Sequence, residues 1–171
     1  MKLPDRFIHM GSKITLDRMM PIKNIRLFPK PQGGIWTAPY KKDGKSLSDW
    51  HRWCINEDFI DYTGKDCSII TLKKNSKIAV INSQQDAIKL YRTYRQDRDE
   101  NLQKLGLSTN FIDFEKLALD YDAIYLTEAG EADTRYRFEA DEIRLFGWDV
   151  ETLLILRPDC IDTIEYIICE K

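Results

Sequence analysis

Apolar residues recur at helical spacing in three stretches, which predicts helices over residues 46–59, 83–95 and 113–122. In the first stretch, Trp50 and Trp53 fall on one face, and either Ser46 or Ser48 is suited to cap the N-terminus. The second stretch opens with a Ser-x-x-Asp sequence that resembles a capping box. The predicted helices therefore all lie in the middle part of the chain.

Short apolar runs predict strands over residues 67–74, 77–81, 123–129, 152–158 and 161–169. A turn at Asn75 and Ser76 separates the first two runs, and Pro158-Asp159 separates the last two. The first forty residues contain five prolines and the pair Gly33-Gly34, which favour short strands and loops over long helices. Strands bracket the helices without a regular βαβ alternation, so the predicted fold class is α+β.

The length and composition suit one domain over residues 1–171. A chain of 171 residues with 43% hydrophobic and 32% charged residues is typical of a soluble globular protein. No apolar run approaches the roughly 18 residues of a membrane span. The N-terminal sequence MKLPDRF lacks the apolar core of a signal peptide, so we expect a cytoplasmic protein without a membrane partner.

The cysteines and the charge distribution indicate the state of the thiols and the kind of partner that the chain could bind. The four cysteines include no CxxC pair, so we expect reduced, mostly buried thiols. Residues 1–110 carry 20 Lys and Arg against 12 Asp and Glu, a net charge of +8, whereas residues 111–171 carry 6 against 16, a net charge of −10. The basic part permits a polyanionic partner such as a nucleotide or RNA, although such segregation is more often only solvated surface.

Several common catalytic patterns are absent from the sequence. It has no GxGxxG, Walker-type or HExxH motif, and its two histidines are too few for a multi-histidine metal site, so no metal is expected. Three segments remain whose residues could take part in catalysis or ligand binding. They are IHMGS in a predicted first strand, GGIWTAP in a predicted second strand, and GWDVETLLILRP leading into a late strand.

Taken in this order, the three segments resemble the ADP-ribosyltransferases, in the branch whose signature is a histidine, an aromatic residue and a glutamate. FIHMGS supplies His9, followed by the small residues of the first motif. GIWTAP supplies Trp36 and Thr37, and Glu151 precedes the late strand TLLILRP. The match departs from the family pattern at Trp36, where tyrosine is usual, and at Ala38, which replaces a second hydroxyl. The resemblance implies a split β-sheet core with flanking helices.

The resemblance also implies NAD as substrate and assigns roles to these residues. Glu151 would stabilise the oxocarbenium character that develops when the bond between nicotinamide and ribose breaks. Trp36 and one of Trp50 and Trp53 would sandwich the nicotinamide cation, because aromatic faces attract flat cations by about 0.5–2 kcal/mol. His9 would act in catalysis and bond a ribose hydroxyl. The other expected cofactor-binding residues are Met10, Gly11, Ser12, Gly34 and Thr37, with Asp149 as a lesser candidate for the choice of acceptor.

These residues have structural interpretations as well. A lone histidine is often a satisfied structural group, tryptophans at helical spacing often belong to the core, and Glu151 could be an exposed carboxylate at a strand end. The leading hypothesis is a transferase that modifies a protein or a nucleic acid, in the manner of a toxin with a neutralising antitoxin partner. The alternatives are a catalytically inactive binding module of the same fold and a nucleic-acid-binding protein that uses residues 41–53, where Lys, Arg and Trp interleave.

Overall fold

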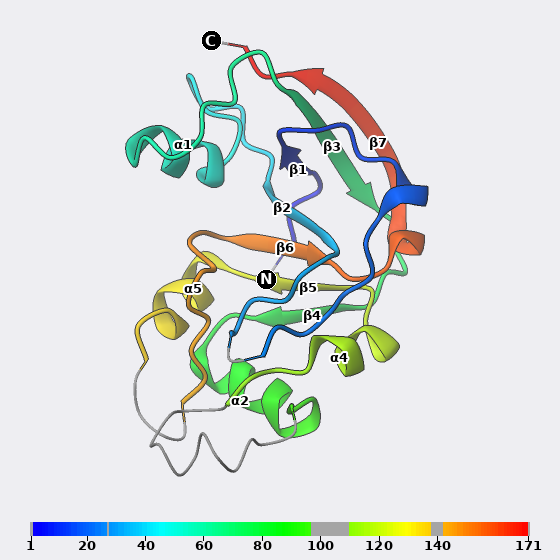
Figure 1. Cartoon of the computed structure of the whole chain (residues 1–171), viewed down its shortest axis with the longest axis vertical. Coiled ribbons are helices and arrows are strands. Elements are labelled where there is room, and N and C mark those ends of the chain that lie inside the picture. The colour runs from blue at the N-terminus through cyan, green and yellow to red at the C-terminus, as the bar shows by residue number, and fades with distance from the viewer. Residues whose placement is uncertain (1, 27, 97–109, 138–141, 171) are drawn as a thin grey trace.

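Seven strands form one mixed sheet in the computed structural model, which describes residues 2–26, 28–96, 110–137 and 142–170. The order of the strands across the sheet is β4-β5-β6-β2-β1-β3-β7 (Figure 1). Their bounds are Phe7–Met10 (β1), Ile35–Pro39 (β2), Asp66–Leu72 (β3), Ile78–Ile81 (β4), Ala123–Leu126 (β5), Thr152–Ile155 (β6) and Ile161–Ile168 (β7). The predicted α+β class is confirmed.

Four α-helices flank this sheet within the described ranges. They are α1 (Asp49–Asn56), α2 (Gln84–Thr93), α4 (Phe114–Asp120) and α5 (Glu128–Thr134). Ser48 caps α1, Ser83 caps α2 and Asp113 caps α4, each by accepting a backbone N–H from the first turn. Short 3-10 turns occupy Leu16–Arg18 and Pro158–Cys160. Among the helices that the structure describes, none combines the length and the apolar character that a membrane span requires.

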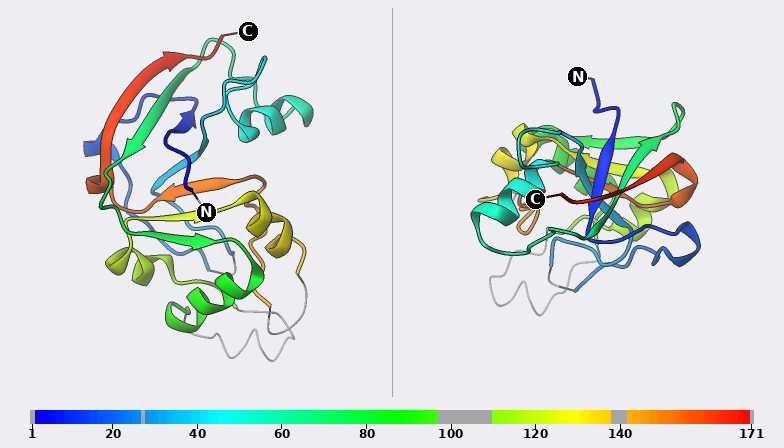
Figure 2. Two further views of the ribbon diagram at one scale, coloured as in Figure 1. Left: turned by 180° about the vertical axis from the view of Figure 1, so that it is seen from behind. Right: turned by 90° about the horizontal axis from the view of Figure 1, so that it is seen from above.

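The sheet twists strongly between its two ends. Strands β4, β5 and β6 run across the middle of Figure 1, whereas β3 and β7 run steeply at its upper right. The views in Figure 2 show β3 and β7 as an outer curved ribbon, with α2 and α4 at the other end of the sheet. β4 and β5 pair in parallel, and the other neighbouring strands pair antiparallel.

Alternation along the strands divides the core into separate apolar clusters. On β5, Ile124 and Leu126 pack in the cluster beneath α2 and α4, whereas Tyr125 points to the other side, toward Phe7 of β1. A third cluster under α1 contains Ile8, Met10 and Tyr62 together with three of the cysteines. Successive residues of β1 therefore serve different clusters, as the two-residue period of a strand requires.

Several predicted boundaries need correction. The predicted strand over 123–129 ends at Leu126, because Thr127 caps α5, a helix that the sequence pattern did not predict. The helix predicted over 46–59 is shorter, and the strand predicted over 152–158 ends at Ile155. The strands predicted on either side of Asn75 exist, but they do not form a hairpin, since β3 and β4 lie near opposite ends of the sheet.

Candidate functional site

The site begins where two neighbouring strands part. β1 and β2 pair only through Phe7 with Pro39 and Ile8 with Ala38. Beyond these pairs, β1 stays with β3, and the first residues of β2 pair with β6 on its other side. The C-terminal end of β1 and the N-terminal end of β2 therefore border an opening in the sheet.

His9 bridges this opening with its side chain. Its Nδ1 lies 2.8 Å from the carbonyl oxygen of Trp36, and its Nε2 lies 3.1 Å from Oγ of Ser12. Burial lowers the pKa of His9, and its bond to the Trp36 carbonyl only partly opposes this, so the neutral imidazole is favoured. Because a carbonyl only accepts, we assign the proton to Nδ1, and Nε2 then accepts from the Ser12 hydroxyl.

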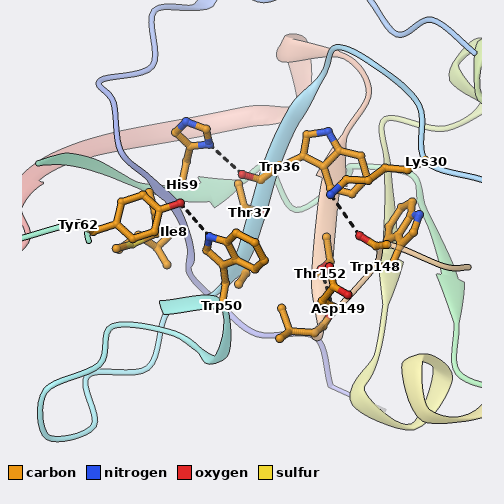
Figure 3. A pocket seen from close by; sticks show the side chains of 14 residues that line it. Ile8, His9, Lys30, Trp36, Thr37, Trp50, Tyr62, Trp148, Asp149 and Thr152 are labelled. Carbon is orange, nitrogen blue, oxygen red and sulfur yellow. Dashed lines mark hydrogen bonds between the residues drawn. The ribbon is translucent and has the colours of Figure 1, made fainter. Parts of the chain in front are cut away.

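A pocket of about 190 Å³ lies beside this bridge. That volume is below the range of about 300–1,000 Å³ for sites of whole drug-sized ligands, so it suits one ring of a larger molecule. The lining comes from β1, β2, α1, the start of β6 with the segment that leads into it, and the two loops that carry Lys30 and Tyr62 (Figure 3). The lining residues are Ile8, His9, Met10, Lys30, Trp36, Thr37, Ala38, Trp50, Tyr62, Gly147, Trp148, Asp149, Val150 and Thr152.

Trp36 and Trp148 form one aromatic wall of the pocket. Their ring centroids are 4.7 Å apart with an interplanar angle of 65°, an edge-to-face contact. Trp148 is fully buried and its indole N–H donates to the carbonyl oxygen of Pro29 at 3.3 Å. This buried indole holds Trp36, which is half-buried, in a fixed orientation.

Trp50 and Tyr62 form the facing wall. The indole N–H of Trp50 donates to the Tyr62 hydroxyl at 3.1 Å, and the two side chains lie together across the pocket from Trp36 (Figure 3). Trp53 stacks on Trp50 with centroids 5.1 Å apart and an interplanar angle of 13°. Trp53 is not among the described residues that line the pocket, so of the two helix tryptophans it is Trp50 that faces the pocket.

Two opposite charges flank the Trp36 wall. The Lys30 ammonium lies 4.4 Å from the centroid of the Trp36 ring and donates to the Gly147 carbonyl at 3.2 Å. Burial lowers the pKa of Lys30, and the charge of Asp149 partly opposes this. The Asp149 carboxylate accepts from Nη2 of Arg135 at 2.8 Å. The pocket therefore combines aromatic surface with a cation and an anion that are each held in place.

Glu151 lies beside the pocket rather than in its described lining, although both its chain neighbours line it. One carboxylate oxygen accepts from the hydroxyl of Tyr125, and the other lies 3.3 Å from Nζ of Lys41. Burial and the bond to this carboxylate raise the pKa of Tyr125, so the phenol stays protonated and donates. The carboxylate of Glu151 is therefore held in place by contacts at both of its oxygens.

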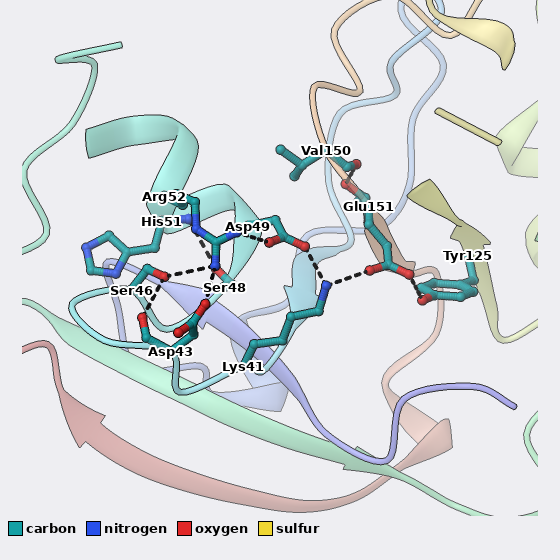
Figure 4. A network of polar contacts seen from close by, with 11 residues as sticks. Lys41, Asp43, Ser46, Ser48, Asp49, His51, Arg52, Tyr125, Val150 and Glu151 are labelled. Atoms are coloured by element: carbon teal, nitrogen blue, oxygen red, sulfur yellow. Dashed lines mark hydrogen bonds and ion pairs between the residues drawn. The ribbon is translucent and has the colours of Figure 1, made fainter. Parts of the chain in front are cut away.

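The contacts of Glu151 extend into α1 as a chain of ion pairs (Figure 4). Lys41 also pairs with Asp49 at 2.6 Å, Asp49 pairs with Arg52 at 3.2 Å, and Arg52 pairs with Asp43 at 3.0 Å. These basic residues belong to the stretch 41–53 for which nucleic-acid binding was considered. Because acidic neighbours occupy them, this stretch offers less free positive charge than its sequence suggests.

Three other predicted residues, Gly11, Gly34 and Thr37, have structural roles around the site. Gly11 has φ of +93°, and a Cβ there would lie 3.0 Å from the Tyr62 ring. Gly34 has φ of +66°, and a Cβ there would lie 2.7 Å from the Ile155 carbonyl oxygen, so glycine lets β2 approach β6. The Thr37 hydroxyl donates to the Leu153 carbonyl at 2.7 Å and is thus engaged in the sheet.

Sequence reasoning overlooked several residues of the site. Trp148 stands in the quoted segment GWDVETLLILRP, yet no role was predicted for it, and Lys30 and Tyr62 lie in loops without a recognisable motif. Within the described ranges, no group of His, Cys, Asp and Glu side chains is arranged to hold a metal ion. Comparisons with models of protein families, with curated proteins and with solved structures found no match for this chain. Any assignment of function therefore rests on the chemistry of the site.

Proposed function

We propose that the chain is an NAD-dependent ADP-ribosyltransferase with an ADP-ribosyltransferase-like split sheet, in which the pocket between Trp36 and Trp50 receives the nicotinamide ring. One observation carries this proposal. Three segments that are far apart in the sequence meet at a single opening, since β1, β2 and β6 are neighbours and their motif residues border one aromatic pocket or lie beside it. The size of the pocket suits one flat ring, and its walls suit a ring that stacks.

In this proposal, His9 recognises a ribose hydroxyl next to the ring. The neutral imidazole bonds Ser12 through Nε2, and a ligand hydroxyl would replace Ser12 at this nitrogen. The exchange conserves a hydrogen bond and leaves the bond from Nδ1 to the Trp36 carbonyl intact. Met10, on the same strand as His9, also lines the pocket.

Glu151 acts on the ribose side of the reaction. The bond between ribose C1′ and the ring nitrogen breaks, both electrons go to that nitrogen, and positive charge develops on the ribose. The carboxylate stabilises this charge, as carboxylates do in glycoside hydrolysis. The lone pair of the acceptor then forms the new bond to C1′, and its proton passes to the carboxylate or to water. The acceptor is a protein or a nucleic acid.

A second candidate function is a module that binds the ring without turnover. The observation that favours it is the engagement of both Glu151 oxygens, one by Tyr125 and one by Lys41. In that case the ion pair with Lys41 persists when NAD binds, and Glu151 serves the fold. The two candidates differ in one measurable property, the release of nicotinamide.

The test uses purified protein, labelled NAD and total cell lysate. We expect the wild type to release nicotinamide and to label an acceptor, and Glu151→Gln to do neither. Glu165→Gln is the matched control. Glu165 lies on β7, in the outer part of the sheet, and its carboxylate pairs with Arg6, so the variant neutralises a paired carboxylate outside the site. Loss of the label on treatment with protease or with nuclease identifies the acceptor class. Binding of NAD without nicotinamide release by the wild type would support the second candidate instead.

A further inference from the structure

The pocket proposed for a cationic ring already contains a cation. Lys30 belongs to the loop before β2, and its ammonium lies over the Trp36 ring at 4.4 Å from the centroid (Figure 3). Its hydrogen-bond partner is the Gly147 carbonyl oxygen, which carries no full charge. Asp149 is close enough to influence Lys30, but its carboxylate is paired with Arg135. The positive charge of the ammonium is therefore only partly neutralised by its neighbours, and it acts on a ring bound in the pocket.

The ammonium weakens the binding of a cationic ring, whichever face of Trp36 that ring stacks on. On the face that Lys30 covers, a cationic ring would meet the ammonium directly and be repelled. On the opposite face, Lys30 already draws on the electron density of the indole, which weakens its attraction for a second cation. A neutral ring of the same shape suffers neither penalty.

We propose that Lys30 makes this pocket prefer neutral nicotinamide to the nicotinamide cation and thereby promotes the departure of nicotinamide from NAD. This inference rests on the proposed function. During cleavage the electron pair of the C1′–N bond moves to the ring nitrogen, so the ring loses its charge while the ribose gains it. Lys30 raises the energy of the bound cation, and that penalty disappears as the bond breaks.

Glu151 complements this effect from the other side. Positive charge moves away from the ring beside Lys30 and toward the ribose, where the carboxylate attracts it. The two groups thus favour the same displacement of charge, one by repulsion in the bound substrate and the other by attraction in the transition state. Lys30 acts on the reacting ring itself, so it is a catalytic residue of the proposed reaction.

Steady-state kinetics of Lys30→Met with NAD test this role. Removal of a ground-state penalty stabilises the bound substrate but not the transition state, so we expect kcat and KM both to fall about tenfold while kcat/KM stays constant. Lys30→Arg retains the charge and should keep both values near those of the wild type. Lys89→Met, which removes an exposed charge on α2, is the control for net charge. A fall in kcat/KM at unchanged KM would overturn the inference.

A binding experiment tests the same preference without turnover. Nicotinamide and 1-methylnicotinamide are flat rings of similar shape that differ in charge, and the pocket tryptophans report their binding by fluorescence. We expect the wild type to bind the neutral ring more tightly, and Lys30→Met to shift the ratio of the two dissociation constants about tenfold toward the cation. An unchanged ratio in a wild type that cleaves NAD refutes the role of Lys30 alone. A wild type that binds neither ring and releases no nicotinamide refutes the proposed function.

Discussion

Glu151 has two partners of different strength, and the structure predicts which of them holds it. Tyr125 is 1% exposed, and its hydroxyl donates to one carboxylate oxygen. The Lys41 side chain is 44% exposed, and its ammonium lies 3.3 Å from the other oxygen, while a second carboxylate, Asp49, competes for it. The side chain of Glu151 itself is 15% exposed. Double-mutant cycles measure each contribution separately.

The expected coupling energies follow from these environments. A buried hydrogen bond to a charged group contributes about 1.5–3 kcal/mol, so the cycle of Tyr125→Phe with Glu151→Ala should give about 2 kcal/mol. A partly exposed ion pair contributes about 0.2–1 kcal/mol, so the cycle of Lys41→Met with Glu151→Ala should give less than about 1 kcal/mol. Salt at 1 M reduces the Debye length to about 3 Å, so it should remove most of the Lys41 coupling and little of the Tyr125 coupling.

The assay is urea unfolding followed by tryptophan fluorescence at neutral pH, for the wild type, the three single variants and the two double variants. The dependence of the free energy of unfolding on urea concentration should have the same slope in all variants. Equal slopes allow their free energies of unfolding to be compared directly. A Lys41 coupling as large as that of Tyr125, or a Tyr125 coupling that vanishes in 1 M salt, would refute the reasoning. Under the proposed function, Tyr125→Phe should also lower kcat, because the carboxylate loses the partner that orients it.

Three further predictions concern stability and reactivity. Gly34→Ala should lower the free energy of unfolding in urea by about 3 kcal/mol, because alanine costs about 1–2 kcal/mol at this φ and its Cβ meets the Ile155 carbonyl. Gly44→Ala, at a similar φ but with open space around it, should cost only about 1 kcal/mol. Burial lowers the pKa of His9 and of His51 below the ordinary value of 6.5, so protonation favours the unfolded chain. The melting temperature should therefore fall as the pH decreases from about 6.5 toward the folded pKa values, and a flat profile between pH 7 and 5 would contradict this. Burial raises the thiol pKa to about 11 at three cysteines, so a thiol reagent at pH 8 should react with them only after denaturant is added; these are Cys54, Cys160 and Cys169.

The sequence pattern predicted those elements whose local signal agrees with their packing. Ser83 and the apolar spacing that follows it predict α2, and the apolar run over residues 161–169 predicts β7. The helix α5 escaped prediction because Gly130 and Asp133 are weak helix formers. Gly130 is required for packing, since a Cβ there would lie 2.2 Å from the Ile81 carbonyl oxygen. A long-range contact thus imposed a residue that hides the local signal.

Local sequence patterns also could not predict which strands pair with one another. A turn near Asn75 suggests that the strands on either side of it are neighbours, but β4 instead joins β5 in parallel after a connection that contains α2 and α4. In β5, all four residues are buried, because helices cover one face and the cluster around Tyr125 covers the other. Parallel strands that are covered on both faces read as continuous apolar runs, so the sequence shows a strand without showing its partner.

The site was only partly predictable for a related physical reason. Residues such as His9 and Trp36 lie on strands whose patterns can be read, whereas Lys30 and Tyr62 reach the pocket from loops. His9 has a structural task in any function, because its ring replaces the backbone pairing that β1 and β2 lose where they separate. The bond through Nδ1 fixes the ring, and this leaves Nε2, whose present partner is the exposed Ser12, as the nitrogen that a ligand can reach. The structural and the functional interpretations of this histidine are therefore compatible, since the first determines which nitrogen serves the second.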